Sequence, residues 1–404
     1  TGLTTGGSSN AGTVALTFTS DEATTSFEAG DITLNGGSIG ALSGSGTTYT
    51  ATFTPTVAQG SKTIDVALNT FTDASGNQNS AATQFIYTYD TVAPTMTITS
   101  TTVSSGDTSN DATVAYVFTA GQATADFDVS DITIAGGSLS ALSGSGAVYT
   151  ATFTPADDGA TTVSVAAGTF TDAAGNANTV SNTFTWTYDG TGPTMTITAT
   201  GLTTGGSSNA GTVALTFTSD EATTSFEAGD ITLNGGSIGA LSGSGTTYTA
   251  TFTPTVAQGS KTIDVALNTF TDASGNQNSA ATQFIYTYDT VAPTMVITTT
   301  TAGVTTGSTT NDATVAYVFT AGQATTNFVV GDITETGGSW TDFTGVSSTE
   351  YTATFTPSGQ GATSVSVDAG AFTDAAGNAN TVSNSFVWTY DSVGPTMTIT
   401  ATGL

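Results

Sequence analysis

The chain has 404 residues, and its net charge of −29 comes from 31 Asp and Glu against only 2 Lys and Arg. So few cations exclude binding to nucleic-acid phosphates or to an anionic membrane surface. His and Cys are both absent, which excludes His-based triads, thiol nucleophiles, disulfides and thiolate metal sites. No glycine-rich phosphate loop precedes a helix, so we predict that the chain is not an enzyme.

An internal repeat of about 100 residues dominates the sequence, and this step is the size of one self-sufficient β-sandwich. Residues 1–96 recur letter for letter as residues 200–295, and two related units complete an A-B-A-B′ order. Each unit carries Tyr-Thr-Ala-Thr-Phe-Thr-Pro, then Phe-Thr-Asp-Ala-x-Gly-Asn, then Tyr-Asp and Pro-Thr-Met. The acids also recur in every unit, as a structural device would.

Within a unit, Thr, Val, Ile, Phe and Tyr alternate with polar residues at period two, which predicts strands throughout. Gly-Gly and Ser-Gly-Ser-Gly stretches mark the turns between them. In the second unit the expected strands lie, in chain order, around residues 96–98, 114–118, 132–134, 139–142, 149–153, 163–165 and 184–188. About seven short strands at this spacing predict an all-β chain of immunoglobulin-like sandwiches, with a small closed barrel as the competing fold.

The segment Pro-Thr-Met-Thr-Ile-Thr is expected to form the first strand of the domain that follows it. Each linker is then three residues long and ends at a proline, which favours a stiff joint and an elongated array of roughly 150 Å. The predicted domains are 1–90 (A-type), 94–189 (B-type), 193–289 (A-type) and 293–391 (B-type variant).

On this division, domain 1–90 lacks a first strand of its own, while residues 395–404 are a first strand with no domain behind them. One interpretation is that the chain is cut from a continuous array at an arbitrary phase. The other is donor-strand exchange, in which the tail of one chain completes the first domain of the next.

Acidic and amide side chains gather at the ends of the domains that face the joints. Packed carboxylates repel one another, and Ca²⁺ with 6 to 8 oxygen ligands would relieve that repulsion and fix the joint. Two alternatives stand beside this one: the acidity only keeps the protein soluble, and Asp-Ala-x-Gly-Asn only caps a turn. The candidate Ca²⁺ ligands are Asp21, Glu22, Asp31, Asp73 and Asn77 in the first unit; Asp90, Asp131, Asp172 and Asn176 at the first joint; Asp189, Asp220, Glu221, Asp230, Asp272 and Asn276 at the second; and Asp289, Asp332, Asp374 and Asn378 at the third.

The ordered motifs, together with Phe-x-x-x-Asp-Ile-Thr-x-x-Gly-Gly at 27–37, resemble the bacterial Ig-like (Big) repeats of giant surface adhesins and extracellular fibre proteins. The resemblance covers essentially the whole chain. It implies a surface-exposed stalk, often stiffened by cations, in a secreted bacterial protein whose partners are neighbouring copies of the domain. The fourth unit departs from the pattern at Glu335, Trp340 and Asp342, which leaves open an alternative function as an adhesive module for a glycan or another surface ligand.

Overall fold

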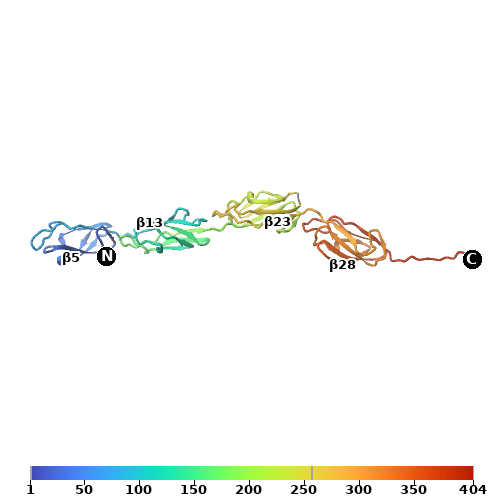
Figure 1. Ribbon diagram of the computed structural model, residues 1–404, viewed down its shortest axis with the longest axis horizontal. Coiled ribbons are helices and arrows are strands. Elements are labelled where there is room, and N and C mark those ends of the chain that lie inside the picture. Colours follow the sequence, from blue (N-terminus) through green and yellow to red (C-terminus); the bar gives the residue numbers. More distant parts are fainter. Residues whose placement is uncertain (1, 256–257, 404) are drawn as a thin grey trace. The chain divides into compact units, whose positions relative to one another are not determined.

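The computed structural model describes residues 2–255 and 258–403, and it consists of strands with short 3-10 turns. The chain divides into two compact units, Thr1–Thr191 and Gly192–Leu404. Each unit contains two β-sandwiches, which we call domains 1 to 4 in chain order (Figure 1). The predicted all-β chain of tandem Ig-like sandwiches is therefore confirmed, and the closed barrel is not observed in the described residues.

Domain 2 has two four-stranded sheets. All strand pairs are antiparallel except for β9, which runs parallel to β15. The first sheet has the order β12-β13-β10-β8, with strands Gly137–Leu139, Ser143–Pro155, Val114–Thr124 and Met96–Ser100. The second has the order β11-β14-β15-β9, with strands Ile132–Ala135, Gly159–Val165, Phe184–Tyr188 and Thr108–Ser109.

Domain 3 repeats this topology. One sheet is β16-β18-β21-β20, formed by Met195–Ala199, Val213–Thr223, Ser242–Pro254 and Gly236–Ile238. The other is β17-β23-β22-β19, formed by Ser207–Ser208, Phe284–Tyr288, Gly259–Val265 and Ile231–Asn234.

Domain 4 has the same plan with one longer edge strand, β28. Its sheets are β24-β26-β29-β28 (Met295–Thr299, Val315–Ala321, Glu350–Pro357 and Gly338–Gly345) and β25-β31-β30-β27 (Thr309–Thr310, Phe386–Tyr390, Gly361–Val367 and Ile333–Thr336).

Domain 1 differs because one of its sheets has only three strands. That sheet is β2-β5-β4 (Val14–Thr24, Ser43–Pro55 and Gly37–Ile39), and within residues 2–255 and 258–403 no strand pairs with the outer edge of β2. The other sheet is complete as β1-β7-β6-β3 (Ser8–Ser9, Phe85–Tyr89, Gly60–Val66 and Ile32–Asn35). The four 3-10 turns η1 to η4 are Ala29–Asp31, Val129–Asp131, Ala228–Asp230 and Val330–Asp332.

The core of each sandwich follows from the alternation that the sequence shows. Along β10, Val114, Tyr116, Phe118 and Ala120 are buried, and the residues between them are exposed or half-buried. Every second side chain therefore faces the opposite sheet. Tyr116, Phe118 and Phe153 are fully buried there, and Trp186 is 2% exposed. Trp186 therefore belongs to the core and offers no stacking surface. Among the described residues, no helix is long and apolar enough to span a membrane.

Candidate strand-binding groove and domain joints

The open edge of β2 can be understood from domain 3, because the two domains share their sequence. In domain 3, β16 pairs with β18 so that Met195 lies opposite Ser219, Ile197 opposite Phe217 and Ala199 opposite Leu215. Domain 1 contains the whole of this acceptor strand as β2, but no donor pairs with it.

Without that strand, the core of domain 1 opens into a groove of about 1290 Å³. Four phenylalanines on its walls are only partly buried, whereas their copies in domain 3 are 0–7% exposed. The pairs are Phe18 and Phe217, Phe27 and Phe226, Phe71 and Phe270, and Phe85 and Phe284.

Polar groups along the rim of the groove also lack the partners that their copies have. The Asp220 carboxylate accepts hydrogen bonds from the Thr194 amide (2.7 Å) and hydroxyl (2.6 Å), and the Ser279 amide donates to the Pro193 carbonyl (3.0 Å). The corresponding residues of domain 1 are Asp21 and Ser80, beside which no strand runs.

The C-terminal tail is the counterpart of the groove. From Ser392 to Gly403 it forms no strand, and Met397 and Ile399 are 89% and 90% exposed (Figure 1). Its sequence from Pro395 onward is identical to residues 193–202, which hold β16. The chain thus presents one copy of this strand inside a domain and a second copy free of any domain.

A hydrogen-bonded clasp joins domain 1 to domain 2. Asn10, in the loop after β1, donates through its amide N–H to the Ala174 carbonyl (3.1 Å) and through Nδ2 to Asn176 Oδ1 (3.1 Å). Asn176 in turn donates to the carbonyl of Asp90 in the linker (2.9 Å). Asn176 is 8% exposed and Asn10 is exposed, so the contacts of the clasp are partly buried.

The same clasp recurs between domains 3 and 4. Asn209 donates to the Ala376 carbonyl (3.1 Å) and to Asn378 Oδ1 (3.1 Å), while Asn378 donates to the Asp289 carbonyl (2.9 Å). Both clasps join an A-type domain to the B-type domain that follows it. Their recurrence with the same atoms shows that the clasp is a property of the repeat sequence.

The aspartate of the Asp-Ala-x-Gly-Asn motif organises its own turn. Asp172 Oδ1 accepts from the amides of Ala174 and Asn176, and Oδ2 accepts from Asn176 Nδ2, each at 2.9 Å. In domain 1 the side chain of Asn77 makes the equivalent bond and lowers the pKa of Asp73. These contacts support the turn-capping interpretation of the motif, and they orient Asn176 toward the joint.

Four other candidate ligands each close a 3-10 turn. The carboxylate of the last residue of the turn accepts from a backbone amide three residues earlier, at 2.8 Å in every domain. These residues are Asp31, Asp131, Asp230 and Asp332. Burial raises the pKa of Asp131, and the neighbouring carboxylates of Asp128 and Asp126 add to that rise. The linker residues Asp90 and Asp289 likewise bond the amides of Val92 and Val291 at 2.9 Å.

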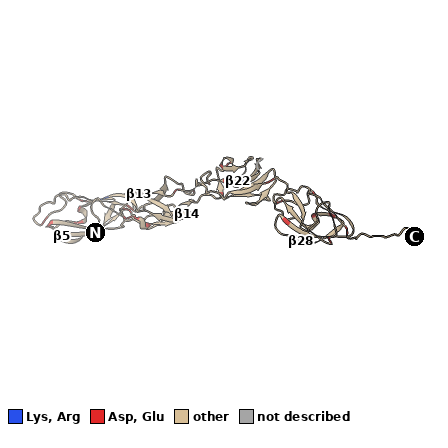
Figure 2. Cartoon of the chain, turned by 45° about the vertical axis from the view of Figure 1, so that its right-hand side comes forward, with Lys and Arg blue, Asp and Glu red and all other residues tan. Residues whose placement is uncertain are grey.

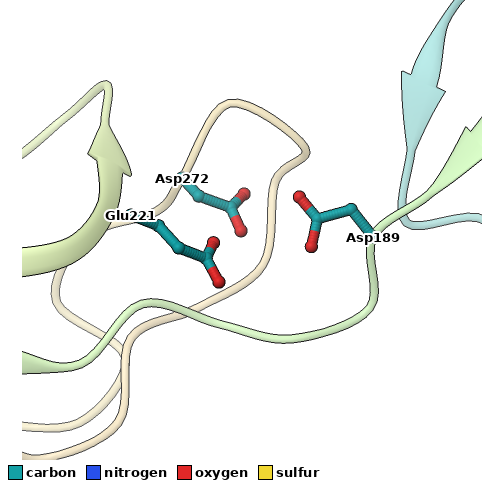
Figure 3. A group of neighbouring side chains, drawn as sticks. All are labelled: Asp189, Glu221 and Asp272. Carbon is teal, nitrogen blue, oxygen red and sulfur yellow. The ribbon is translucent and has the colours of Figure 1, made fainter. Parts of the chain in front are cut away.

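Acidic side chains occur in every domain (Figure 2), and one pair of carboxylates comes close together within domain 3. Carboxylate oxygens of Glu221 and Asp272 lie within 4.8 Å of each other, and Asp272 is 3% exposed. Figure 3 shows the side chains of Glu221 and Asp272. Two like charges at this separation repel unless a cation or a proton lies between them. The remaining Ca²⁺ assignments stay predictions.

Comparison with known families agrees with this geometry. The bacterial Ig-like domain profile matches residues 3–89, 90–188, 189–288 and 289–390. The chain belongs to the bacterial Ig-like domain family. No curated protein sequence matches it.

Among solved structures, these bacterial Ig-like domains are similar to the Escherichia coli adhesin FdeC, at 17% identity over 72% of this chain and 96% of that one, with a TM-score of 0.33. Invasin, a bacterial integrin-binding protein, is 14% identical over 94% and 79% of the two chains, with a TM-score of 0.35. InvD of Yersinia pseudotuberculosis is 16% identical over 75% and 84%, with a TM-score of 0.28.

In the fourth bacterial Ig-like domain, the segment around Trp340 that departs from the repeat pattern adds to the core of the domain. Trp340 Nε1 donates to Glu335 (3.1 Å), and its ring packs against Tyr317, Phe319 and Phe355 at centroid distances of 5.1–5.7 Å. This packing does not favour a ligand platform. The sequence reasoning missed Asn10 and Asn209, although their place in a loop beside an expected joint was a usable signal.

Proposed function

We propose that these four domains are the structural repeat region of an extracellular bacterial surface protein, where they form a stiff stalk or fibre and perform no catalysis. The observation that carries the proposal is the clasp, which occurs twice with the same three hydrogen bonds. A three-residue linker that ends in proline restricts the joint further. A repeated set of partly buried hydrogen bonds between neighbouring domains resists bending, which is what a stalk requires.

Small-angle scattering of the intact chain tests the stalk, with a variant that carries Asn10→Ala and Asn209→Ala as the comparison. We expect a rod-like scattering profile for the unaltered chain and a shorter mean length for the variant, whose joints bend more freely. The matched control is Asn35→Ala with Asn234→Ala, because these exposed asparagines lie on β3 and its copy β19 and take part in neither clasp. A flexible-chain profile for the unaltered protein would contradict the stalk.

The proposal includes head-to-tail assembly by donor-strand exchange. The open edge of β2 and the free strand sequence of the tail support it, since unpaired strand edges recruit other strands. Repetition of one head-to-tail contact generates an open filament. Negative-stain microscopy of the concentrated chain should show filaments, and chains that remain single at every concentration would contradict this part.

Ca²⁺ at the joints is the third part of the proposal. Its support is the acidic composition and the Glu221–Asp272 pair, whose oxygens are of the type that Ca²⁺ prefers. Calorimetric titration with Ca²⁺, with Mg²⁺ as control, tests it. The substitutions Glu221→Gln and Asp272→Asn should remove binding, whereas the same changes at their copies Glu22 and Asp73 in the open domain should matter less. Equal heats for all three proteins would contradict a Ca²⁺ site in domain 3.

A further inference from the structure

We infer that each A-type domain carries a site of self-modification, at which Asn35 and its copy Asn234 lose the side-chain amide group to attack by the next backbone nitrogen. The product is aspartate or isoaspartate. The pairs 35–36 and 234–235 are the only Asn-Gly pairs in the sequence. Each pair lies within one domain, next to the four-stranded sheet that domains 1 and 3 both possess.

The reaction needs water as its only co-reactant. The nitrogen of Gly36 attacks Cγ of Asn35, which forms a C–N bond and closes a cyclic imide. The bond between Cγ and Nδ2 breaks, and ammonia leaves with the proton that the Gly36 nitrogen has lost. Water then opens the imide at either carbonyl, so that the new carboxylate lies on an ordinary or on a lengthened backbone.

The local backbone leaves the reacting groups accessible. Asn35 is the last residue of β3, its side chain is exposed, and the pairing of β3 with β6 ends there. Gly36 follows between two strands with a φ of +81°, and Gly235 repeats this conformation with a φ of +79°. Glycine adopts this region without strain and has no side chain to hinder the attack.

A lysine side chain runs alongside the glycine whose nitrogen must lose its proton. A Cβ atom on Gly36 would lie 2.7 Å from Cδ and 3.1 Å from Nζ of Lys62. Lys62 is 2% exposed, donates to the Ala58 carbonyl, and has Nζ 5.7 Å from the centre of the Tyr89 ring. Because positive charge favours the deprotonated form of a neighbouring group, Lys62 should accelerate the attack.

The asparagine and the lysine occur together in both A-type domains. In domain 3 a Cβ atom on Gly235 would lie 3.0 Å from Nζ of Lys261, which is also 2% exposed. These two lysines are the only basic side chains in the sequence. The B-type domains replace both members of the pair, with Ala135 and Thr161 in domain 2 and Thr336 and Thr363 in domain 4.

The modified residue lies next to a loop that contacts the linker. The Gly36 carbonyl accepts hydrogen bonds from the amide (2.9 Å) and the hydroxyl (3.0 Å) of Thr56. At the other end of this loop, Gln59 donates to the Thr91 hydroxyl (2.9 Å) and accepts from the Thr91 amide (3.2 Å). An isoaspartate lengthens the backbone before Gly36 by one methylene group, which displaces the carbonyl from Thr56 and loosens the loop.

Timed incubation of the folded, full-length chain measures the reaction, because the two lysines place Asn35 and Asn234 in different peptides. After unfolding, lysine-specific proteolysis gives residues 1–62, 63–261 and 262–404. Mass spectrometry should show aspartate and isoaspartate accumulating at both asparagines. Asn10 is the only other asparagine of the first peptide and precedes an alanine, so it is the internal control. No product at either site, or equal product at Asn10, would overturn the inference.

Replacement of one lysine tests its contribution, with the other site of the same molecule as reference. Lys261→Met should slow the reaction of Asn234 in the folded chain about tenfold, which corresponds to about 1.4 kcal/mol in the barrier, and leave Asn35 unchanged. Lys261→Thr, the residue of the B-type domains, should have the same effect. In concentrated urea all three chains should react alike, because no lysine is then held beside Gly235. An unchanged rate at Asn234 in both folded variants would reject the role of the lysine.

The products distinguish the imide from direct attack by the lysine. Attack of Lys261 on Asn234 would release ammonia without uptake of water and would make Lys261 resistant to the protease, and this result would overturn the inference. An aged chain should also melt at a lower temperature than an equally aged chain with Asn35→Gln and Asn234→Gln, because glutamine closes a larger imide ring more slowly. Equal melting temperatures would reject the loosening of the loop at Thr56.

Discussion

Domains 1 and 3 have one sequence in two states, because the chain supplies the first strand to only one of them. In domain 3, Phe217 and Phe270 are 0% and 1% exposed, while Phe18 and Phe71 in domain 1 are only partly buried. Asp73, which also lines the groove, is half-buried, whereas its copy Asp272 in domain 3 is 3% exposed. One edge strand of a few residues thus decides whether the core is closed.

This comparison teaches that an incomplete sandwich still folds but keeps a reactive edge. The second sheet and the hairpins of domain 1 form with the same pairings as in domain 3. The missing strand is therefore separable from the rest of the fold. Because this strand is absent, the unpaired edge favours binding of a strand of matching sequence.

The largest expected effect comes from closing domain 1 covalently. Fusion of the residue 193–199 sequence in front of Thr1 gives domain 1 its own strand and should raise its free energy of unfolding by several kcal/mol, since burial of an Ile or Met contributes about 1.5–3 kcal/mol. Calorimetry should show a low-temperature transition of the unaltered chain move up to that of domain 3. The fused chain should also lose any head-to-tail assembly. An unchanged first transition would show that the open edge costs domain 1 little stability.

The next largest effect is expected from substituting the isoleucine that β16 and the tail share, Ile197 and Ile399. Ile197→Ala should destabilise domain 3 by about 2–5 kcal/mol, because this side chain is buried in the core. Ile399→Ala should leave every melting transition of the single chain unchanged, because Ile399 is 90% exposed. Equal destabilisation by both substitutions would mean that the tail already occupies a groove in solution.

The clasp offers a smaller, matched comparison. Asn176→Ala breaks the bonds to Asp90 and Asn10 and leaves buried polar groups unpaired, which should cost about 1–3 kcal/mol. Asn77→Ala removes the corresponding residue of domain 1, whose side chain bonds Asp73 of its own turn and, among the described residues, no group of another domain, so its cost should be smaller by at least about 1 kcal/mol. Chemical denaturation of both variants measures the difference. Equal costs would show that Asn176 acts only within its own turn.

Most of the fold was accessible from the sequence, because period-two alternation and a repeat of one sandwich length leave few other architectures. The missing strand of domain 1 was accessible too, since the phase of the Pro-Thr-Met motif reveals it. For the clasp, the sequence offered only the place of Asn10 in a loop beside an expected joint, because Asn10 and Asn176 are 166 residues apart and no local pattern pairs the two loops.

The acidic residues show a different reason why the sequence does not predict the whole candidate site. Sequence reasoning grouped Asp31, Asp131, Asp230 and Asp332 with the joints, but their carboxylates cap 3-10 turns. A carboxylate that closes a turn and one that awaits a cation have the same sequence pattern, Asp near Gly or Ser. Only the position of nearby amides distinguishes them.

The smallest expected effect concerns pH and again compares domain 3 with domain 1. Burial alone would raise the pKa of Asp220, but hydrogen bonds from Thr194 outweigh it and hold the pKa below the ordinary value of 3.8. A carboxyl whose pKa is lower in the folded state stabilises that state above its unfolded pKa, and this stabilisation is lost as the pH falls through the folded value. Asp220→Asn should therefore lower the free energy of unfolding of domain 3 at pH 7 by less than about 1 kcal/mol, because the group is exposed and screened. Thermal melting should show this as a slightly lower melting temperature at pH 7 and almost no change near pH 2.5. Asp21→Asn in the open domain lacks the Thr194 partner, so it should show no such pH dependence. If the two variants behaved alike at both pH values, the Thr194 bonds would not be the cause.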